Sequence, residues 1–216
     1  MENDCYISTA SQELLNPTFE VTKQYLEVME VEVENNLPRV ARVNLELHEE
    51  TAAVYFYIKN ERFFIVVNVS KVNSKVVEWV WMESGHRVYL TAISREHSFL
   101  ELSKYFPFSN LSGWSIGELR KNGKSKHNFT RVSYEPIANE AYSLEEKLFG
   151  LLKNLEEYSE DIRKLVKYSG AYISVCRNQY ISANAGIHLN CEIIHRLSVM
   201  NLELDIDTYI LGTEIE

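Results

Sequence analysis

One pentapeptide in the sequence has the spacing of a hydrolase active site. The segment GWSIG, residues 113–117, matches the Gly-x-Ser-x-Gly pattern, in which a serine nucleophile sits on a sharp turn between a strand and a helix. Asp161 and either His188 or His195 follow Ser115 in the chain order that such a triad needs. Polar residues precede the segment and a basic loop follows it, so neither the strand nor the helix is predicted there. We therefore predict that Ser115 is not a nucleophile.

A second set of residues has the types found in zinc sites. His188, Cys191 and His195 are spaced by three and four residues, so they would share one face of a continuous helix. Asn190 is a favoured helix-capping residue, and we predict that it starts a helix only after His188. The three side chains then do not share a face, and we predict no metal site.

Paired carboxylates occur near the end of the sequence. Asp205 and Asp207 are two residues apart, with Glu203 on the same side, a spacing that could hold a divalent cation or serve acid–base chemistry. Apolar residues at positions 202, 204 and 206 alternate with these carboxylates, which is typical of a strand with one solvated face. The sequence therefore predicts no catalytic residue, no metal and no cofactor, and a protein that is not an enzyme.

The elements that would position these residues alternate between helix and strand in the second half of the chain. Ser98 with Glu101, and Ser143 with Glu146, form capping boxes that predict two helix starts. Further helices are predicted to start at Ser159 and at Asn190. The predicted strands cover residues 87–94, 128–135, 171–177, 179–184 and 202–210, which gives the order β-α-β-α-α-β-β-α-β.

The first half of the chain is predicted to be mostly strand, with one short helix between Ser8 and Leu15. Residues 25–34 and 41–50 alternate apolar and polar side chains, and the apolar runs 53–58 and 62–69 flank a polar turn and predict a hairpin. Residues 76–83 and 87–94 follow with a short connection, which favours an antiparallel meander. The predicted fold class is α+β: an antiparallel β-rich N-terminal half, residues 1–86, packed with an α+β C-terminal half, residues 87–216.

Composition is that of an ordinary globular protein. The 216 residues are 45% hydrophobic and 25% charged, and the three cysteines Cys5, Cys176 and Cys191 have no disulfide-framework spacing. The chain begins with acidic and polar residues, unlike a signal peptide, and no apolar run reaches the roughly 20 residues that a membrane span needs. We therefore expect a soluble, cytoplasmic protein that has no membrane partner.

Charge is distributed unevenly along the chain. The formal net charge is −9, divided as −7 over residues 1–86, +4 over residues 87–139 and −6 over residues 140–216. The segment 119–131 contains no acidic residue and five basic ones: Arg120, Lys121, Lys124, Lys126 and Arg131. With Trp114 and Phe129 nearby, this segment could bind phosphates or single-stranded nucleic acid through charge and stacking.

Several segments of the second half resemble a known family. They are VYLTAISREHSFLELSKYF, GWSIGELRKNGK, NFTRVSYEP, SLEEKLFGLLKNLEEYSEDIRKL and HLNCEIIHRLSVMNLELDIDTYI. Over about residues 88–209 the chain resembles the bacterial domain-of-unknown-function family numbered 4279, whose members show a Trp followed by Lys-Gly-Asp and a closing Leu-Asp-Ile-Asp-x-Tyr. The sequence keeps Trp114, Gly117 and residues 204–207 before Tyr209, but it has Ile116 and Glu118 where Lys and Asp are expected. The resemblance implies a domain over this range and no particular activity.

Aromatic and acidic side chains in the first half favour a protein partner. Tyr55, Tyr57, Trp79 and Trp81 recur at strand spacing, so they either lie under covering elements or anchor a partner. Acidic proteins attract basic ones, and nuclease toxins are basic because their substrate is anionic. We therefore expect an immunity protein that neutralises such a toxin through these aromatic residues and through Glu30, Glu32, Glu34, Glu46, Glu49 and Glu50. Two alternatives stay open: a nucleic-acid or phosphate-binding module that uses segment 119–131, and a ligand-binding protein or enzyme of unrecognised type.

Overall fold

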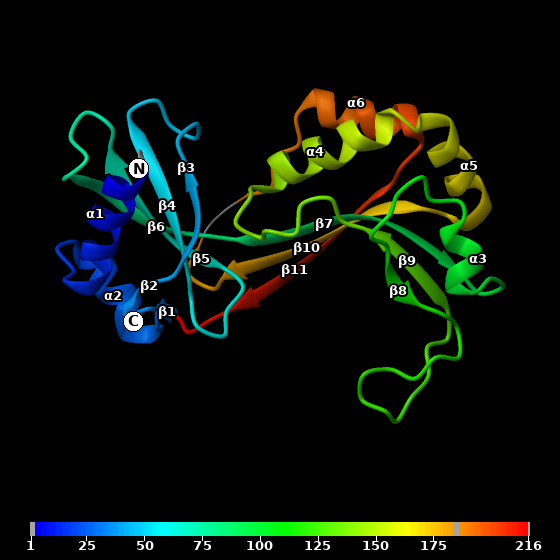
Figure 1. Ribbon diagram of the computed structural model, residues 1–216, viewed down its shortest axis with the longest axis horizontal. Coiled ribbons are helices and arrows are strands. Elements are labelled where there is room, and N and C mark those ends of the chain that lie inside the picture. Colours follow the sequence, from blue (N-terminus) through cyan, green and yellow to red (C-terminus); the bar gives the residue numbers. More distant parts are fainter. Residues whose placement is uncertain (1–2, 184–185, 216) are drawn as a thin grey trace.

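The computed structural model describes residues 3–183 and 186–215, which form two β-sheets with helices packed on them (Figure 1). The N-terminal half contains α1 (Asp4–Leu15), α2 (Glu20–Val28), β1 (Val33–Glu34), β2 (Leu37–Pro38), β3 (Val40–Asn44), β4 (Thr51–Tyr57), β5 (Phe64–Ser70) and β6 (Val77–Glu83). The C-terminal half contains β7 (Gly85–Ser94), α3 (Phe99–Ser103), β8 (Ser112–Trp114), β9 (Thr130–Tyr134), α4 (Leu144–Glu156), α5 (Ser159–Ser169), β10 (Tyr172–Tyr180), α6 (Cys191–Met200) and β11 (Leu204–Leu211). The predicted α+β class is confirmed.

The first sheet is an antiparallel meander in the order β3-β4-β5-β6, and it is covered on both faces. One face, with Phe56 and Ile65 at its centre, packs on α1, α2 and the end of the chain. The other face, which carries Tyr55 and Phe64, packs on Ala141 from the loop before α4. Because both faces are buried, β4 and β5 are nearly continuous apolar runs. They form the hairpin that the sequence predicts.

The predicted strand over residues 25–34 is wrong in its first part, because residues 25–28 belong to α2. Val21, Tyr25 and Met29 recur every four residues and all pack on the first core, and this contact favours a helix over a strand. Within the range 25–34 the only named strand is β1, at Val33–Glu34. The predicted strand over residues 41–50 likewise ends early, since β3 stops at Asn44.

The chain passes from the first sheet to the second at Ser84 and Gly85. The predicted meander therefore ends with β6, because β7 pairs with β9 and β10 rather than with β6. A Cβ atom on Gly85 would lie 1.8 Å from the carbonyl oxygen of Arg62. This close approach of two backbone segments requires glycine at the first residue of β7.

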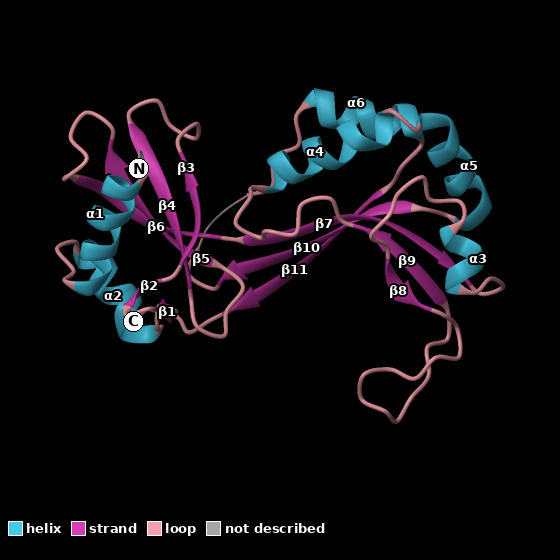
Figure 2. Cartoon of the chain, viewed as in Figure 1, coloured by secondary structure: helices cyan, strands magenta, loops and turns pink. Residues whose placement is uncertain are grey.

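The second sheet has the order β11-β10-β7-β9-β8, and helices α4, α5 and α6 lie over one of its faces (Figure 2). Leu148, Leu152 and Leu165 from these helices pack on Leu90 and Val175 of the sheet. Both predicted capping boxes are confirmed at α3 and α4, and the Asn190 side chain accepts a hydrogen bond from the backbone of α6.

The predicted pair of strands over residues 171–177 and 179–184 is wrong, because β10 is one continuous strand that ends at Tyr180. Asn178, which lies between the two predicted strands, is buried within the sheet beside Gly85. Residue 184 lies outside the described residues. A crossover through α6 makes β11 parallel to β10, and the other strand pairs of this sheet are antiparallel.

Among the described residues, no helix lies over the second face of this sheet (Figure 2). Residues 115–128 continue the β8–β9 pair as an irregular hairpin that extends away from the sheet (Figure 1). Across the described ranges 3–183 and 186–215, no helix combines the length and the apolar character needed to cross a bilayer.

Candidate functional site

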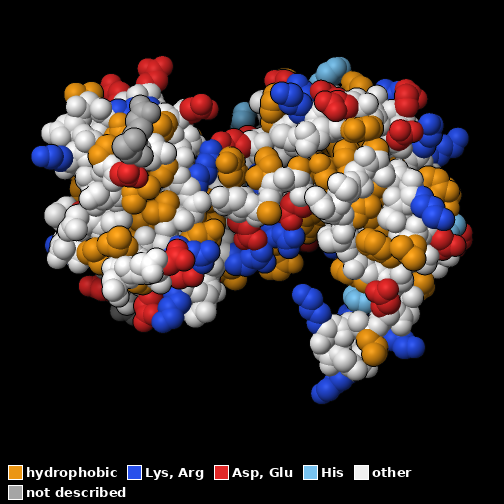
Figure 3. Space-filling view, viewed as in Figure 1, with side chains coloured by type: hydrophobic (Ala, Val, Ile, Leu, Met, Phe, Trp, Pro, Cys, Tyr) orange, Lys and Arg blue, Asp and Glu red, His pale blue; other side chains and the backbone are white. Residues whose placement is uncertain are grey.

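Two loops lie together at one end of the first sheet. Residues 45–50 connect β3 to β4 and residues 71–76 connect β5 to β6. The Lys71 ammonium group donates hydrogen bonds to the carbonyl oxygens of Leu45, His48 and Glu49, at 2.5, 2.6 and 3.1 Å. We call residues 45–50 and 71–76, together with Trp79, the acidic tip. Figure 3 shows acidic side chains along this edge of the N-terminal half, which is its upper edge in the view.

The acidic tip also carries exposed apolar and aromatic side chains. The His48 ring lies 5.4 Å from the Trp79 ring and 6.1 Å from the Trp81 ring, and the two indoles stack at 6.4 Å. Trp79 is 39% exposed and Val72 is 93% exposed. Leu47 and Val76 are exposed as well, and so are Glu46, Glu49 and Glu50. Exposed large side chains ringed by polar ones are typical of protein-binding surfaces.

The other three glutamates of the predicted surface lie elsewhere. Glu30, Glu32 and Glu34 follow α2, beyond the opposite end of β4, so the structure divides the six predicted glutamates into two groups. The Glu30 carboxylate pairs with Lys59 at 2.6 Å, and the Glu32 carboxylate pairs with Arg39 at 2.7 Å. The hydrogen bond from Lys59 and its charge lower the pKa of Glu30. Two of these three acids are thus already neutralised by neighbours.

The predicted aromatic residues are likewise divided by the fold. Tyr55 is 3% exposed and faces the second half of the chain, where burial raises its pKa. Tyr57 is half-buried, with the Arg39 guanidinium 4.4 Å from its ring centroid. Of the four aromatic residues, Trp79 belongs to the acidic tip and Trp81 contacts its residue His48, whereas Tyr55 and Tyr57 do not belong to it.

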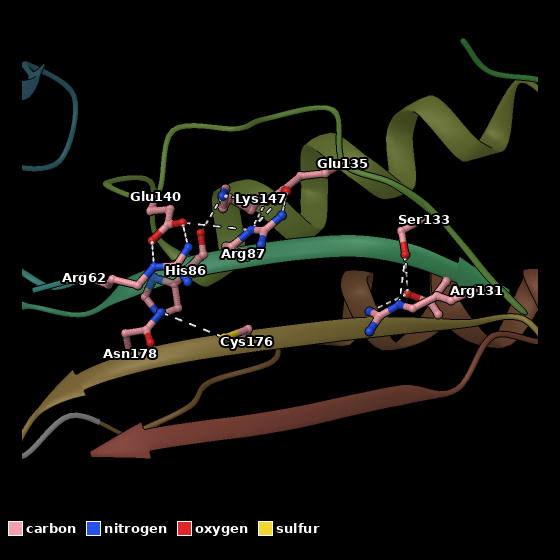
Figure 4. Close-up of polar contacts among 11 residues, drawn as sticks. Arg62, His86, Arg87, Arg131, Ser133, Glu135, Glu140, Lys147, Cys176 and Asn178 are labelled. Atoms are coloured by element: carbon pink, nitrogen blue, oxygen red, sulfur yellow. Dashed lines mark hydrogen bonds and ion pairs between the residues drawn. The ribbon is translucent and has the colours of Figure 1, made fainter. Parts of the chain in front are cut away.

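A network of ion pairs joins the two sheets where the loop before α4 passes the start of β7 (Figure 4). Glu140 pairs with Arg62 from the first half, and its carboxylate lies 3.9 Å from Arg87 on β7. Arg87 in turn pairs with Glu135 at 2.6 Å, and the Lys147 ammonium lies 3.7 Å from Glu135. This network holds charges of both signs in near balance, and its members bind one another.

Two members of this junction are deeply buried. Lys147 donates a hydrogen bond to the carbonyl oxygen of His86, and burial lowers the pKa of its ammonium group. Burial, together with the nearby Arg177 and Lys147 charges, lowers the pKa of His86 to about 4. Sequence reasoning missed this cluster. The available signal was Lys147 itself, a lysine on the apolar stripe of the helix that starts at Ser143.

The predicted basic residues lie on and beside the hairpin of residues 115–128. Arg120, Lys121, Lys124 and Lys126 are exposed, whereas Arg131 lies half-buried on β9. Trp114 stacks on His127 with ring centroids 4.3 Å apart. The Phe129 ring lies 5.9 Å from Trp114, so the structure brings the basic side chains and both predicted aromatic residues to a single end of the second sheet.

Among the residues that the structure describes, the remaining candidates do not come together in a site. The Ser115 hydroxyl accepts a hydrogen bond from the backbone N–H of Phe99, and a basic hairpin rather than a helix follows it. His188, Cys191 and His195 are exposed. Within the part of the chain that the structure describes, no three His, Cys, Asp or Glu side chains are grouped closely enough to hold a metal ion. Asp205 and Asp207 are exposed on β11, as expected for a solvated face.

Comparison with known protein families gives a match that coincides with the second sheet. The family described as "Domain of unknown function (DUF4279)" matches residues 84–211, which begin one residue before β7 and end with β11. Neither the curated proteins nor the solved structures contain a match. The match spans more than half of the sequence, and the chain therefore belongs to the DUF4279 family.

Proposed function

We propose that this chain is a protein-binding protein without catalytic activity, and that it acts as an immunity protein in the bacterial cytoplasm by neutralising a basic toxin of the nuclease type. The acidic tip is the observation that carries this proposal. Glu46, Glu49 and Glu50 lie on the loop 45–50, which Lys71 joins to the neighbouring loop, and the exposed indole of Trp79 on β6 contacts His48 of the same loop.

Three features of the acidic tip fit a basic protein partner: its carboxylates, its exposed indole and its ordered loops. A nuclease carries positive charge where it binds its anionic substrate, so an acidic surface attracts it and guides the approach. A partly exposed tryptophan next to aliphatic side chains is the usual anchor of a protein interface, because burying it removes a large apolar area from water. The bonds from Lys71 order both loops before binding, which reduces the entropy that a partner must remove.

The first experiment identifies the partner. The tagged protein is purified from its own cells, treated with nuclease, and analysed for stoichiometric partners by mass spectrometry. We expect one basic protein that is toxic when it is expressed alone and harmless when this chain is present. A partner that is acidic, or one without toxicity, contradicts the proposal.

Two matched variants then test the surface. Glu46→Gln/Glu49→Gln/Glu50→Gln removes three negative charges from the acidic tip. Glu203→Gln/Asp205→Asn/Asp207→Asn removes three from exposed positions on and before β11. We expect the first variant to weaken the complex at least about tenfold, and the second to change it by less than about threefold. Equal effects of the two variants would assign binding to net charge and reject the acidic tip.

A third variant tests the anchor. Trp79→Ala should weaken the complex about 30-fold or more if this indole is a central anchor of the interface. Because the side chain is 39% exposed, the fold should tolerate its loss. Unchanged affinity of a folded Trp79→Ala protein would remove the indole from the interface.

A further inference from the structure

The helix-free face of the second sheet carries a cation that is held by neutral groups. Arg131 on β9 donates hydrogen bonds to the hydroxyl groups of Ser133, at 3.1 Å, and Thr91, at 3.3 Å. Its guanidinium carbon lies 5.0 Å from the centroid of the Tyr89 ring and 5.7 Å from that of Trp114. No ion pair joins Arg131 to a carboxylate of the described residues, so its charge is oriented but not neutralised.

Its neighbour Arg87 provides a contrast. That guanidinium also lies near Tyr89, with 5.4 Å between its carbon and the ring centroid, but it forms an ion pair with Glu135. Arg87 is thus a structural cation of the junction between the sheets. Arg131 keeps its capacity to bind an anion, because hydroxyl groups and aromatic rings position a guanidinium without cancelling its charge.

The hairpin beyond Arg131 extends the positive surface. Its backbone is ordered by hydrogen bonds from Gly117 to His127, from His127 to Glu118 and from Arg120 to Ser125, at 2.8, 2.9 and 2.8 Å. The exposed basic side chains of the hairpin are Arg120, Lys121, Lys124 and Lys126. Figure 3 shows basic side chains projecting from this hairpin, with a hollow between the hairpin and the N-terminal half.

Aromatic rings lie on both sides of Arg131. Trp114 and His127 stack at 4.3 Å and 18° at the base of the hairpin, and Tyr89 lies on the other side of Arg131. The Trp114 indole N–H is buried and has no hydrogen-bond acceptor among the described residues. Asp205 and Asp207 lie on β11, at the edge of the sheet opposite to β8. Their carboxylates repel anions, so the positive surface ends before this edge.

We propose that the surface formed by Arg131, Trp114, Tyr89 and the hairpin of residues 115–128 binds single-stranded nucleic acid. Lysine and arginine side chains contact successive phosphates, and unpaired bases stack on the exposed parts of the rings. A duplex hides the faces of its bases, so it can use the charges but not the rings. This site lies on the second sheet, separate from the acidic tip, and it does not depend on the proposed protein partner.

Fluorescence anisotropy with the purified protein alone tests this proposal. The probe is a labelled thymidine oligonucleotide of about 12 nucleotides, and the comparison is the same strand annealed to its complementary adenosine oligonucleotide. We expect the single strand to bind more tightly than the duplex. The affinity should fall with salt, with a logarithmic slope of about −0.7 for each phosphate contact. Absence of binding at low salt, or tighter binding of the duplex, overturns the proposal.

Two lysine triples provide a matched control. Lys121→Gln/Lys124→Gln/Lys126→Gln removes hairpin charges, and Lys23→Gln/Lys153→Gln/Lys167→Gln removes three exposed charges elsewhere. The hairpin triple should lower the affinity at least about tenfold and flatten the salt slope by about 2, whereas the control triple should retain both. Equal losses in the two triples would show a response to net charge alone and would overturn the site.

Stacking is tested by two substitutions at one position. Trp114→Leu should lower the affinity about fivefold or more, and Trp114→Phe should recover most of it, because phenylalanine keeps a ring for the base to stack on. A purely structural role of Trp114 predicts the same affinity for both folded variants, and that result would exclude the stacking contact.

Discussion

Lys147 on α4 donates a hydrogen bond from its ammonium group to the backbone carbonyl of His86 on β7, at a position where the lysine is 1% exposed. Removing this side chain leaves the carbonyl without its partner and takes one cation from the network around Glu135. We expect Lys147→Met to lower the free energy of unfolding by about 2–4 kcal/mol, as measured by urea denaturation.

Lys153 on the same helix is exposed and serves as the control. Lys153→Met should change the free energy of unfolding by less than about 0.5 kcal/mol. If Lys147→Met were as stable as the wild-type protein, the buried ammonium group would not hold the junction between the sheets.

His86 makes stability depend on pH. Its pKa is lowered from 6.5 to about 4 by burial and by the Arg177 and Lys147 charges, so the unfolded chain takes up a proton at a higher pH than the folded one. The neutral imidazole therefore favours the folded state fully above about pH 6.5. This contribution, up to about 3 kcal/mol, is lost as the pH falls from 6.5 toward 4.

Urea denaturation at pH 7, 6 and 5 compares the wild-type protein with His86→Asn, which lacks the titrating ring. Burial raises the pKa of Glu83, whose protonation shifts stability in the opposite direction, so the difference between the two proteins isolates the histidine. The wild-type protein should lose more stability than the variant over this range. Parallel pH profiles would show that His86 is accessible to protons in the folded state.

Local sequence signals predicted much of this fold. Two capping boxes, the Asn190 cap and the apolar stripe of α4 are contained in a few neighbouring residues, and each was read correctly. The predictions were wrong where contacts between residues far apart in the sequence determine the local secondary structure. Residues 25–28 are helical because Val21, Tyr25 and Met29 find a core on β4 and β5, and the brief alternation at 29–33 carries no information about that contact.

The candidate surfaces show the same division. Glu46, Glu49, Glu50, Trp79 and Trp81 were predicted as partner-binding residues, but no local pattern separates them from Glu30 and Glu32. The separation follows from strand order, which places these two groups at opposite ends of β4, and from ion pairs with Lys59 and Arg39. The charged junction could not be predicted from the sequence for a related reason. Its members come together only after both sheets have formed, and they are Arg62, Arg87, Glu135 and Lys147.

Gly85 is required where the chain changes sheets. Its Cβ position is 1.8 Å from the carbonyl oxygen of Arg62, a backbone atom that cannot rotate away as a side chain would. We expect Gly85→Ala to lower the free energy of unfolding by about 3 kcal/mol or more, with a corresponding fall in the melting temperature.

Gly186 is the matched control, because a Cβ atom there meets no heavy atom within 4 Å. Gly186→Ala should leave the melting temperature within a few degrees of the wild-type value, about the shift of a change below 0.5 kcal/mol. A Gly85→Ala protein that melts together with Gly186→Ala would mean that β7 can move away from Arg62 at little cost.

The charge of the acidic tip should control how fast a basic partner associates with this protein. Lys75 is an exposed base within its loops and opposes a basic partner, so Lys75→Glu makes the local charge more negative by two. With the partner identified, stopped-flow kinetics at low salt should show association about two- to fivefold faster for Lys75→Glu, with a small change in the dissociation rate. Lys153→Glu makes the same charge change on α4 and should accelerate association less.

Because salt screens charges beyond about 10 Å at 0.1 M, the advantage of Lys75→Glu should shrink as salt is added. Equal acceleration by both variants would show that the partner responds to the overall charge of the protein and not to the acidic tip.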